Sequence, residues 1–314
     1  MQVFRGYSEI QKKFTTPVVT IGNYDGLHLG HREIIQSVID RAKKEKGTSI
    51  VYTFRPHPHL ALTPAEELQL INTYDEKLDL LRDMGVDVVV EEPFSREFSE
   101  ISPENFFSDI LLKRLSAHAI YVGYDFGFGR NRSGSLDLLR KMCAQEGVEL
   151  HVAKPSKIDG EIFSSTRVRE YIKAGNVVAA NRLLGREFFY RGLVVRGQGR
   201  GHKIGFATAN VHTESKLRVK EGVYATWALY KGQRYKSVTN VGRQPTFNLG
   251  GDAPVIVETH ILDFDKDIYG ETLEVRMVER LRDEVRFSGI DELVTQIKKD
   301  VEVAKGILAR VSHK

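Results

Sequence analysis

The chain contains 314 residues, which corresponds to roughly two domains at about 150 residues per domain. Its 46 lysine and arginine residues exceed its 42 aspartate and glutamate residues by four, and so mild an excess does not by itself indicate nucleic-acid binding. The single cysteine, Cys143, excludes an internal disulfide framework and a cysteine-based zinc cluster. No apolar run reaches about 18 residues and the N-terminus lacks a signal-peptide core, so we expect a soluble, cytoplasmic protein with no membrane partner.

The N-terminal half alternates short, β-rich apolar runs with longer helical patterns. Strands are predicted at residues 17–22, 49–54, 86–90, 119–123 and 149–152. After the first strand, one helical face carries the apolar residues Ile34, Ile35, Val38, Ile39 and Ala42. Strand–helix alternation at about 30 residues per unit is typical of a parallel sheet, and ligands of such sheets bind at the carboxyl ends of the strands.

A glycine-rich turn, Gly22-Asn23-Tyr24-Asp25-Gly26-Leu27-His28-Leu29-Gly30-His31, joins the first strand to the first helix. The glycines let the backbone approach a ligand closely, and the start of the helix offers unpaired N–H groups to an anion. His28 and His31 lie one turn apart. Two imidazoles there suit charge stabilisation on a phosphate better than metal binding, because no carboxylate or thiol stands at ligand spacing. The alternative is a plain glycine turn with two surface histidines.

Three further segments lie next to predicted strands or helices. Residues 54–58 follow the second strand, residues 122–129 follow the fourth, and residues 163–169 precede a helix. In the last segment, hydroxyl and guanidinium groups stand where a phosphate would bind. Each segment also has a plain explanation, since serine and threonine cap helices and glycines form turns.

The pattern changes near Leu184. Residues 169–184 are predicted to form one or two helices with a break at Gly175, and Gly185 begins the second half. Strands are then predicted at residues 188–195, 223–230, 235–240, 255–262 and 273–281, separated by turn residues, which favours a small antiparallel barrel. A closing helix carries an apolar stripe of Leu293, Ile297, Val301, Ala304 and Leu308, which is expected to pack on the barrel.

Two motifs in the second half could bind a nucleotide. Residues 197–205 form a glycine-rich basic loop that could wrap phosphates, although a plain hairpin loop fits as well. Thr208 and Asn210 alternate along an extended segment, so both side-chain oxygens are expected on one face. Such oxygens are suitable ligands for Mg²⁺ that carries ATP phosphates.

Together these motifs resemble the HxGH nucleotidyltransferase superfamily. More narrowly, they resemble the prokaryotic bifunctional riboflavin kinase/FMN adenylyltransferase family, also called FAD synthetases. The family's GxxDGxHxGH stands at residues 22–31, its VGxDFxFG at residues 122–129, and its ISSTxxR at residues 163–169, with Phe163 replacing isoleucine. Arg55 stands where an acidic residue usually precedes the family's Pro-His-Pro stretch, and Ala207 replaces the proline of its PTAN motif.

The resemblance implies an α/β domain followed by a β-barrel domain. Residues 1–184 would form a Rossmann-like, parallel-sheet FMN adenylyltransferase. Residues 185–314 would form a small antiparallel riboflavin kinase barrel with a C-terminal helix. Riboflavin and ATP would give FMN, and FMN and ATP would then give FAD and pyrophosphate, with Mg²⁺ required.

The resemblance also implies roles for residues. Catalytic residues would be His28 and His31 for adenylyl transfer and Glu258 as the base of the kinase, with Thr208 and Asn210 as metal ligands. ATP and its phosphates would be bound by Gly22, Asp25, Gly26, Gly30, Ser164, Ser165, Thr166, Arg169, Gly199, Arg200, Gly201 and Lys203. The flavin would be contacted by Asp125, Phe126, Phe128, Phe54 and His57.

Two other hypotheses stay open at this point. The first keeps only the adenylyltransferase active, with the barrel as a flavin-binding or regulatory module, because Ala207 removes a fixed backbone angle before Thr208. The second is a nucleic-acid-binding barrel that uses Arg196, Arg200 and Lys203. No aromatic residues interleave those basic residues, so stacking platforms for single strands are not evident and no nucleic-acid partner is expected.

Overall fold

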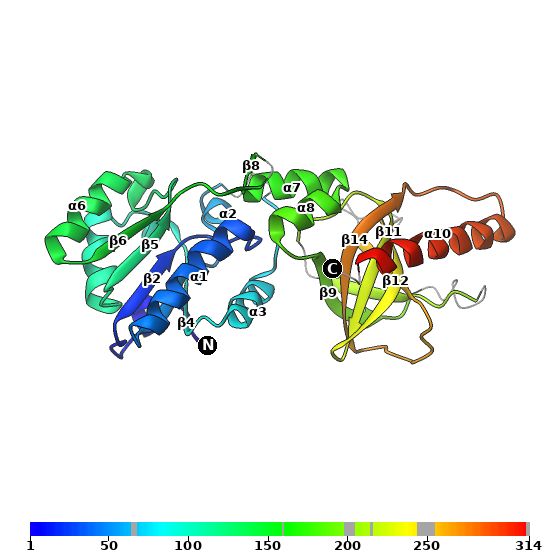
Figure 1. The fold of residues 1–314 in the computed structure, drawn as a ribbon, viewed down its shortest axis with the longest axis horizontal. Coiled ribbons are helices and arrows are strands. Elements are labelled where there is room, and N and C mark those ends of the chain that lie inside the picture. The colour runs from blue at the N-terminus through cyan, green and yellow to red at the C-terminus, as the bar shows by residue number, and fades with distance from the viewer. Residues whose placement is uncertain (64–67, 159, 198–204, 214–215, 244–254, 312–314) are drawn as a thin grey trace. The chain divides into compact units, whose positions relative to one another are not determined.

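The computed structural model describes residues 1–63, 68–158, 160–197, 205–213, 216–243 and 255–311. The chain divides into two compact units, Met1–Ser165 and Thr166–Lys314 (Figure 1). The domain boundary predicted between residues 184 and 185 stays a prediction.

A six-stranded parallel sheet forms the centre of the first unit. Its strands are β1 (Gln2–Phe4), β2 (Pro17–Ile21), β3 (Thr48–Phe54), β4 (Val88–Glu92), β5 (Ala119–Gly123) and β6 (Glu149–Ala153). The order across the sheet is β1-β4-β3-β2-β5-β6, and every adjacent pair is parallel. The predicted α/β class is confirmed. The first strand, β1, was not predicted, because three residues are too short a run to show a period.

The order of the strands creates a switch point beside β2. After β2 the chain passes to β3 and β4 on one side, and it returns to pair β5 on the other side of β2. Connections that leave neighbouring strands in opposite directions open a crevice at the carboxyl ends of those strands. The turn that contains His28 and His31 follows β2, so it lies at this crevice.

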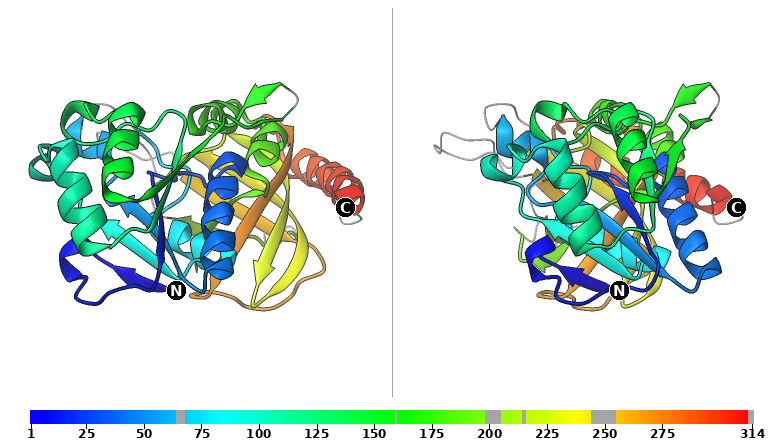
Figure 2. Two further views of the ribbon diagram at one scale, coloured as in Figure 1. Left: turned by 60° about the vertical axis from the view of Figure 1, so that its left-hand side comes forward. Right: turned by 90° about the vertical axis from the view of Figure 1, so that its left-hand side faces the viewer.

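Helices cover both faces of the sheet (Figures 1 and 2). The helices of this unit are α1 (Leu29–Lys44), α2 (Pro58–Leu62), α3 (Tyr74–Met84), α4 (Arg96–Ser99), α5 (Pro103–Asn105), the π-helix η2 (Phe106–Arg114) and α6 (Leu136–Glu146), with 3₁₀ turns η1 (Tyr7–Glu9) and η3 (Arg130–Arg132). A short hairpin of β7 (Lys157–Ile158) and β8 (Glu161–Ile162) follows. Alternate residues of β3 point into two cores: Ile50 and Tyr52 pack with η2, whereas Val51 packs with α1 and α3. Both faces are therefore buried, which explains the continuous apolar runs of the central strands.

The boundary of β4 differs from the prediction at residues 86–90. The strand runs from Val88 to Glu92, so it ends in two glutamates that are nearly fully buried. The Glu92 carboxylate accepts hydrogen bonds from the Tyr52 hydroxyl at 2.6 Å and the Tyr7 N–H at 2.9 Å. Hydrogen bonds therefore allow the carboxylate of Glu92 to be buried at the end of the strand, which a hydrophobic pattern does not reveal.

The second unit begins with two helices, α7 (Ser165–Ala174) and α8 (Val177–Leu184). They confirm the helical prediction for residues 169–184, although α7 starts four residues earlier. The break lies at Gly175, where the backbone is left-handed with φ of 81°. A Cβ at this position would lie 2.7 Å from Cδ of Arg280, so glycine also fits the close packing.

A closed antiparallel barrel follows and confirms the predicted class. Its strands are β9 (Phe188–Val195), β10 (Ala209–Thr213), β11 (Gly222–Tyr230), β12 (Gln233–Arg243), β13 (Val255–Ile261) and β14 (Thr272–Arg282), in the order β10-β13-β12-β11-β14-β9. The C-terminal helix α10 (Ile290–Val311) buries Ala304, Ile307 and Leu308 against residues of β11 and β12. No helix in the described ranges is both long and apolar enough to cross a membrane.

Two candidate active sites

The turn between β2 and α1 is held in a fixed shape. Tyr24, Gly26 and Leu27 adopt left-handed backbone angles, with φ of 50°, 81° and 42°, and the Tyr24 and Leu27 side chains are buried. At Gly26 a Cβ would lie 2.7 Å from Cδ1 of Ile71, and at Gly22 it would lie 2.8 Å from the Tyr24 ring. Close packing therefore favours glycine at both positions, against Tyr24 within the turn and against Ile71 beside it, and contact with phosphate stays a separate prediction.

The structure brings His28 and His31 together at the start of α1. His28 is the residue that caps the helix, and its Nδ1 accepts a hydrogen bond from the His31 N–H at 3.3 Å. The two rings are stacked, with centroids 3.6 Å apart and planes 18° from parallel. Because Nδ1 of His28 accepts, the proton of its neutral ring is on Nε2, which can donate to a ligand.

Electrostatics favour an uncharged His31 ring. Burial lowers the pKa of His31 well below its usual range, and the nearby His28 and Lys77 lower it further. Nδ1 of His31 is buried without a hydrogen-bond partner. A buried, unsatisfied ring nitrogen is costly unless a ligand or water completes its bonding. His31 thus has hydrogen-bonding capacity that the described residues do not use.

Asp25 anchors a neighbouring segment of the chain. Its buried carboxylate accepts hydrogen bonds from the Ile71 N–H at 3.0 and 3.2 Å and from the Asn72 N–H at 3.4 Å. These bonds hold residues 71 and 72 against the turn after β2. The predicted contact between Asp25 and ATP is not tested by this arrangement.

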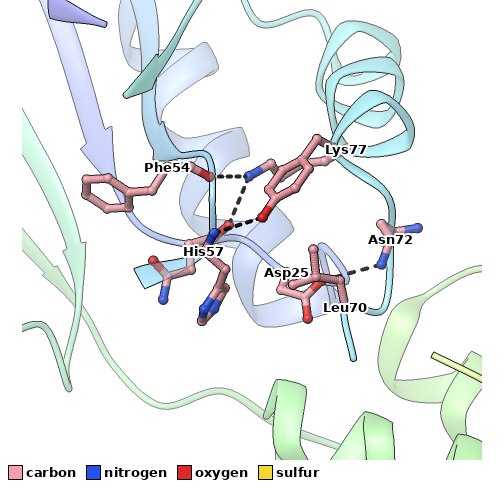
Figure 3. A pocket seen from close by; sticks show the side chains of 8 residues that line it. Asp25, Phe54, His57, Leu70, Asn72 and Lys77 are labelled. Carbon is pink, nitrogen blue, oxygen red and sulfur yellow. Dashed lines mark hydrogen bonds between the residues drawn. The ribbon is translucent and has the colours of Figure 1, made fainter. Parts of the chain in front are cut away.

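Lys77 on α3 is a site residue that sequence reasoning missed. Its buried Nζ donates to Thr53 Oγ1 at 3.0 Å. It also donates to the carbonyl oxygens of Asn23 and Phe54 at 3.4 Å each (Figure 3). Burial lowers the pKa of Lys77 to about 8, although the Asp25 carboxylate opposes that shift. Lys77 therefore ties α3 to the carboxyl ends of both β2 and β3 with a buried ammonium group.

Tyr74, one turn before Lys77, holds the loop after β3. Its hydroxyl oxygen accepts the His57 N–H at 2.8 Å, and the Arg55 guanidinium lies 4.8 Å from the centre of its ring. A capping box of Thr73 and Glu76 starts α3 here. The spacing of Thr73 and Glu76 is a capping-box pattern that can be recognised in the sequence. Tyr74 and Lys77 are three residues apart, so the same helix start places them on one face. The capping box predicts the start of α3 but not the partners of Tyr74 and Lys77.

A small pocket opens between these segments (Figure 3). It brings together Phe54 and His57, both predicted to contact flavin, and Asp25, predicted to contact ATP. The other lining residues are Asn23, Leu70, Asn72, Tyr74 and Lys77. All of these residues belong to the first unit, at or beside the carboxyl ends of β2 and β3.

The predicted flavin residues after β5 differ in exposure. Asp125 is exposed and Phe126 is half-buried, whereas Phe128 is buried in the core with its ring centre 5.8 Å from that of Phe106. The rings of Phe126 and Phe128 are stacked with centroids 5.4 Å apart. Of the two rings, Phe126 is therefore the one with surface available to a ligand.

The Ser-Ser-Thr run lies at the start of α7. Ser165 is the first residue of that helix, and its hydroxyl donates to the Asp25 carbonyl oxygen at 2.9 Å. Ser164 precedes it in the first unit, whereas Thr166 and Arg169 belong to the second. Gly30 lies close to this segment, since a Cβ there would be 3.1 Å from Cβ of Phe163. That these hydroxyls and Arg169 bind phosphates stays a prediction.

The barrel brings Glu258 and Asn210 together. In the strand register, Glu258 on β13 lies opposite Asn210 on β10 and opposite Asn240 on β12. Directly opposed residues of antiparallel strands present their side chains on the same face. The neighbouring Val257 and Thr259 are fully buried, so the face with Glu258 is the one turned away from the interior. Asn240, whose Nδ2 donates to Glu284 Oε1 at 2.9 Å, was not predicted as a site residue.

The donors beside Glu258 fit a magnesium–nucleotide complex. Thr208 and Asn210, the predicted metal ligands, carry a hydroxyl and an amide oxygen, which are hard neutral groups that Mg²⁺ accepts when phosphates complete its coordination. Asn210 packs against Gly197, where a Cβ would lie 2.1 Å from its Nδ2. Within the described residues no three His, Cys, Asp or Glu side chains form a metal-binding group. The predicted loop residues Gly199, Arg200, Gly201 and Lys203 lie outside the described residues.

Comparisons with known proteins match both units. Residues 10–167 match the FAD synthetase family and residues 184–308 match the riboflavin kinase family. The bifunctional riboflavin kinase/FMN adenylyltransferase of Escherichia coli K12 is 35% identical over 92% of this chain and 91% of its own length. The enzyme of the same name from Pseudomonas fluorescens is 34% identical over the full length of both chains, and that of Bacillus subtilis is 32% identical over 94% of this chain and 93% of its own.

A solved structure is also similar. The crystal structure named as a macrolide-efflux protein from Streptococcus pneumoniae has a TM-score of 0.87 and 31% identity, and the match covers 96% of this chain and 98% of that one. The name refers to an efflux activity of that protein. What the match shows for this chain is the same fold.

Proposed function

Because this chain belongs to the family of bifunctional riboflavin kinases/FMN adenylyltransferases, we propose how its residues divide the two reactions between the two units. The chain is a riboflavin kinase and an FMN adenylyltransferase. An adenylyltransferase with an inactive barrel is not favoured, since the riboflavin kinase family matches nearly the whole barrel and its helix. ATP is the substrate that both activities imply, as phosphoryl donor in the kinase reaction and as adenylyl donor in the other.

In the first unit, the FMN phosphate attacks the α-phosphorus of ATP. A new P–O bond forms to the FMN oxygen, and the bond to the bridging oxygen breaks, so that pyrophosphate leaves with the electron pair. The nucleophile is already anionic at neutral pH, so no general base is needed and alignment and charge neutralisation supply the catalysis. His28 and His31 donate N–H groups to the ATP phosphates at the positive end of α1.

The observation that carries this assignment is the stacked His28–His31 pair at the switch point beside β2. Further contacts to the phosphates are assigned to Ser164, Ser165, Thr166 and Arg169. Phe54, His57, Asp125 and Phe126 are assigned to the flavin side. Gly22, Asp25, Gly26 and Gly30 act through the shape of the turn, because packing or hydrogen bonds fix their positions within it or against neighbouring segments.

In the barrel, Glu258 accepts the proton of the ribityl hydroxyl as that oxygen attacks the γ-phosphorus of ATP. The bond between the γ-phosphorus and the β,γ-bridging oxygen breaks, and ADP leaves. Thr208 and Asn210 would hold Mg²⁺, which supplies neutralisation of phosphate charge when it is bound. The in-register placement of Asn210 and Glu258 supports this assignment, because it puts the base beside the nucleotide.

The test starts from two different substrates. Purified protein is incubated with ATP and Mg²⁺ together with either riboflavin or FMN, and the flavins are separated by chromatography over time. We expect FMN to appear before FAD when riboflavin is supplied, and FAD with pyrophosphate when FMN is supplied. No FAD from FMN would overturn the first assignment, and no FMN from riboflavin would overturn the second.

A further inference from the structure

His260 contacts the segment that carries the proposed magnesium ligands. It lies on β13 two residues after Glu258, so both side chains are on the same face of the strand. Its Nδ1 is 2.8 Å from the carbonyl oxygen of Ala207. Its ring also meets the Phe206 ring edge to face, with centroids 5.3 Å apart. His260 thus touches both residues that immediately precede Thr208.

The contact fixes the chemical form of the histidine. A carbonyl oxygen can only accept, so Nδ1 must carry the proton and donate. This makes Nδ1, rather than Nε2, the nitrogen on which the contact depends. A side chain whose N–H donor lies as far from the backbone as Nδ1 of His260 would keep the bond to the Ala207 carbonyl oxygen. A side chain whose donor lies further out would lose it.

Thr208 needs a constraint that the barrel does not supply. The ladder between β10 and β13 begins at Ala209, which pairs with Thr259, so Asn210 is held in the sheet but Thr208 is outside it. Gly205, three residues earlier, has a left-handed backbone with φ of 81°. At position 207 a proline would fix φ through its ring, whereas alanine leaves that angle to be fixed by other contacts.

We propose that His260 is a positioning residue of the kinase site: its Nδ1–H holds the Ala207 carbonyl and thereby places Thr208 beside Asn210 for the magnesium–ATP complex. The proposal rests on the proposed role of Thr208 and Asn210. His260 then has a role separate from that of Glu258, although the two residues lie two apart on β13. The proposal also predicts that this positioning matters more in a chain with Ala207 than in one with proline at position 207.

Two matched substitutions test the bond. In asparagine Nδ2 is bonded to Cγ, as Nδ1 is in histidine, whereas in glutamine Nε2 lies one bond further from the backbone. Both substitutions remove the ring contact with Phe206, so they differ only in where the donor lies. A net hydrogen bond of about 0.5–1.5 kcal/mol corresponds to a change of about 2- to 12-fold. His260→Gln should raise the Mg²⁺ and ATP concentrations for half-maximal FMN formation by about that factor, with kcat at saturation nearly kept, and His260→Asn should stay within about twofold of the unchanged protein.

A readout independent of turnover is amide hydrogen exchange in the full-length, ligand-free protein. Peptides covering residues 205–211 should exchange faster in His260→Gln and nearly normally in His260→Asn. In an Ala207→Pro background the His260→Gln effect on both readouts should shrink, because the ring of proline takes over the constraint. FAD formation from FMN serves as the internal control and should not change.

Asn210→Ala separates the possible failures. If that variant keeps its normal magnesium requirement, the proposed metal site is wrong, whatever His260 does. If Asn210→Ala raises the requirement but His260→Asn and His260→Gln behave alike in kinetics and in exchange, the positioning role of His260 is overturned. A fall in kcat with unchanged half-saturation would also overturn it, because His260 would then act on the reacting groups.

Discussion

His28 and His31 form a stacked pair at the start of α1, so removing either ring should damage adenylyl transfer alone. His28→Ala and His31→Ala are each expected to lower FAD formation from FMN by about 10²–10³-fold, the usual cost of removing one donor to developing charge. FMN formation from riboflavin should persist, because Glu258 and Asn210 lie in the other compact unit. Steady-state assays of both products check this, and equal loss of both activities in a folded variant would contradict it.

At Glu258 the expected defect is one of turnover. Glu258→Gln keeps the size and one acceptor oxygen but cannot take the hydroxyl proton, so kcat for FMN formation should fall by about 10²–10⁴-fold. Riboflavin binding should change little, since the carboxylate acts in the transition state. Kinetics and a fluorescence titration with riboflavin separate the two effects. Near-normal turnover would show that another group accepts the proton, and weakened binding alone would make Glu258 a flavin contact.

Lys77 predicts a dependence of stability on pH. Its pKa is 10.5 as an ordinary lysine and about 8 in the folded protein, so protonation favours the unfolded chain. The destabilisation is complete below pH 8 and disappears as pH rises towards 10.5, which makes the folded state gain roughly 3 kcal/mol over that interval. In Lys77→Met this gain should be absent.

Urea unfolding of both proteins at pH 7.5 and pH 10 measures the difference. Comparing the two proteins cancels the other groups that titrate in this range. An equal change with pH in both proteins would show that the Lys77 ammonium is not desolvated in the folded state.

Because Lys77 joins α3 to Asn23 and Phe54, we expect FAD formation to fall in Lys77→Met even at a pH where the protein stays folded.

Among the elements, α10 depends on one buried ion pair. Asp300 on α10 accepts hydrogen bonds from the Arg282 guanidinium of β14 at 3.0 and 2.8 Å. Asp300→Ala removes the carboxylate partner of the arginine and should cost the barrel about 3 kcal/mol, the lower end for a buried pair, because Arg282 is partly exposed and keeps its bond to the Asp283 carbonyl oxygen. We expect kinase activity to be lost at a lower temperature while FAD formation from FMN keeps its thermal profile. Unchanged heat inactivation of both activities would show that α10 is held by its apolar contacts alone.

The elements themselves were largely predictable from the sequence. Strands buried on both faces, such as β2 and β3, appear as continuous apolar runs, and the face of α1 that carries Ile35 and Val38 follows the helical period. Two local predictions failed. The strand β1 is too short to show a period, and β4 continues into Glu91 and Glu92, where the Glu92 carboxylate accepts a hydrogen bond from Tyr52.

The candidate sites were predictable where a motif is contiguous. His28 and His31 are close in sequence, so their meeting at one helix start follows from spacing. Lys77 is 24 residues from Thr53, and its site role depends on contacts made only after α3 packs on the sheet. Likewise, the pairing of Glu258 with Asn210 on one side and Asn240 on the other is set by strand register, which a single sequence does not specify.

For the whole molecule, the assignment of each reaction to one unit predicts complementation. A mixture of His28→Ala and Glu258→Gln proteins should convert riboflavin to FAD, although neither variant does so efficiently alone. The first protein supplies FMN, which reaches the second through solvent. A lag before FAD formation should shorten as the concentration of the first protein rises. No FAD from the mixture, with each partial reaction intact, would mean that FMN passes between sites of one chain without release.

The closed barrel has a consequence for how this chain tolerates changes in length. Successive residues of a strand point to opposite faces, so deleting one residue of β13 before Glu258 would turn its carboxylate into the interior and bring a neighbour such as Thr259 outward. Because both edges of β13 are paired, the strand has no free side along which to slip back. Insertions and deletions should therefore disturb the fold of the barrel less between strands than within them. The face on which Glu258 lies therefore depends on whether the number of residues before it in β13 is odd or even.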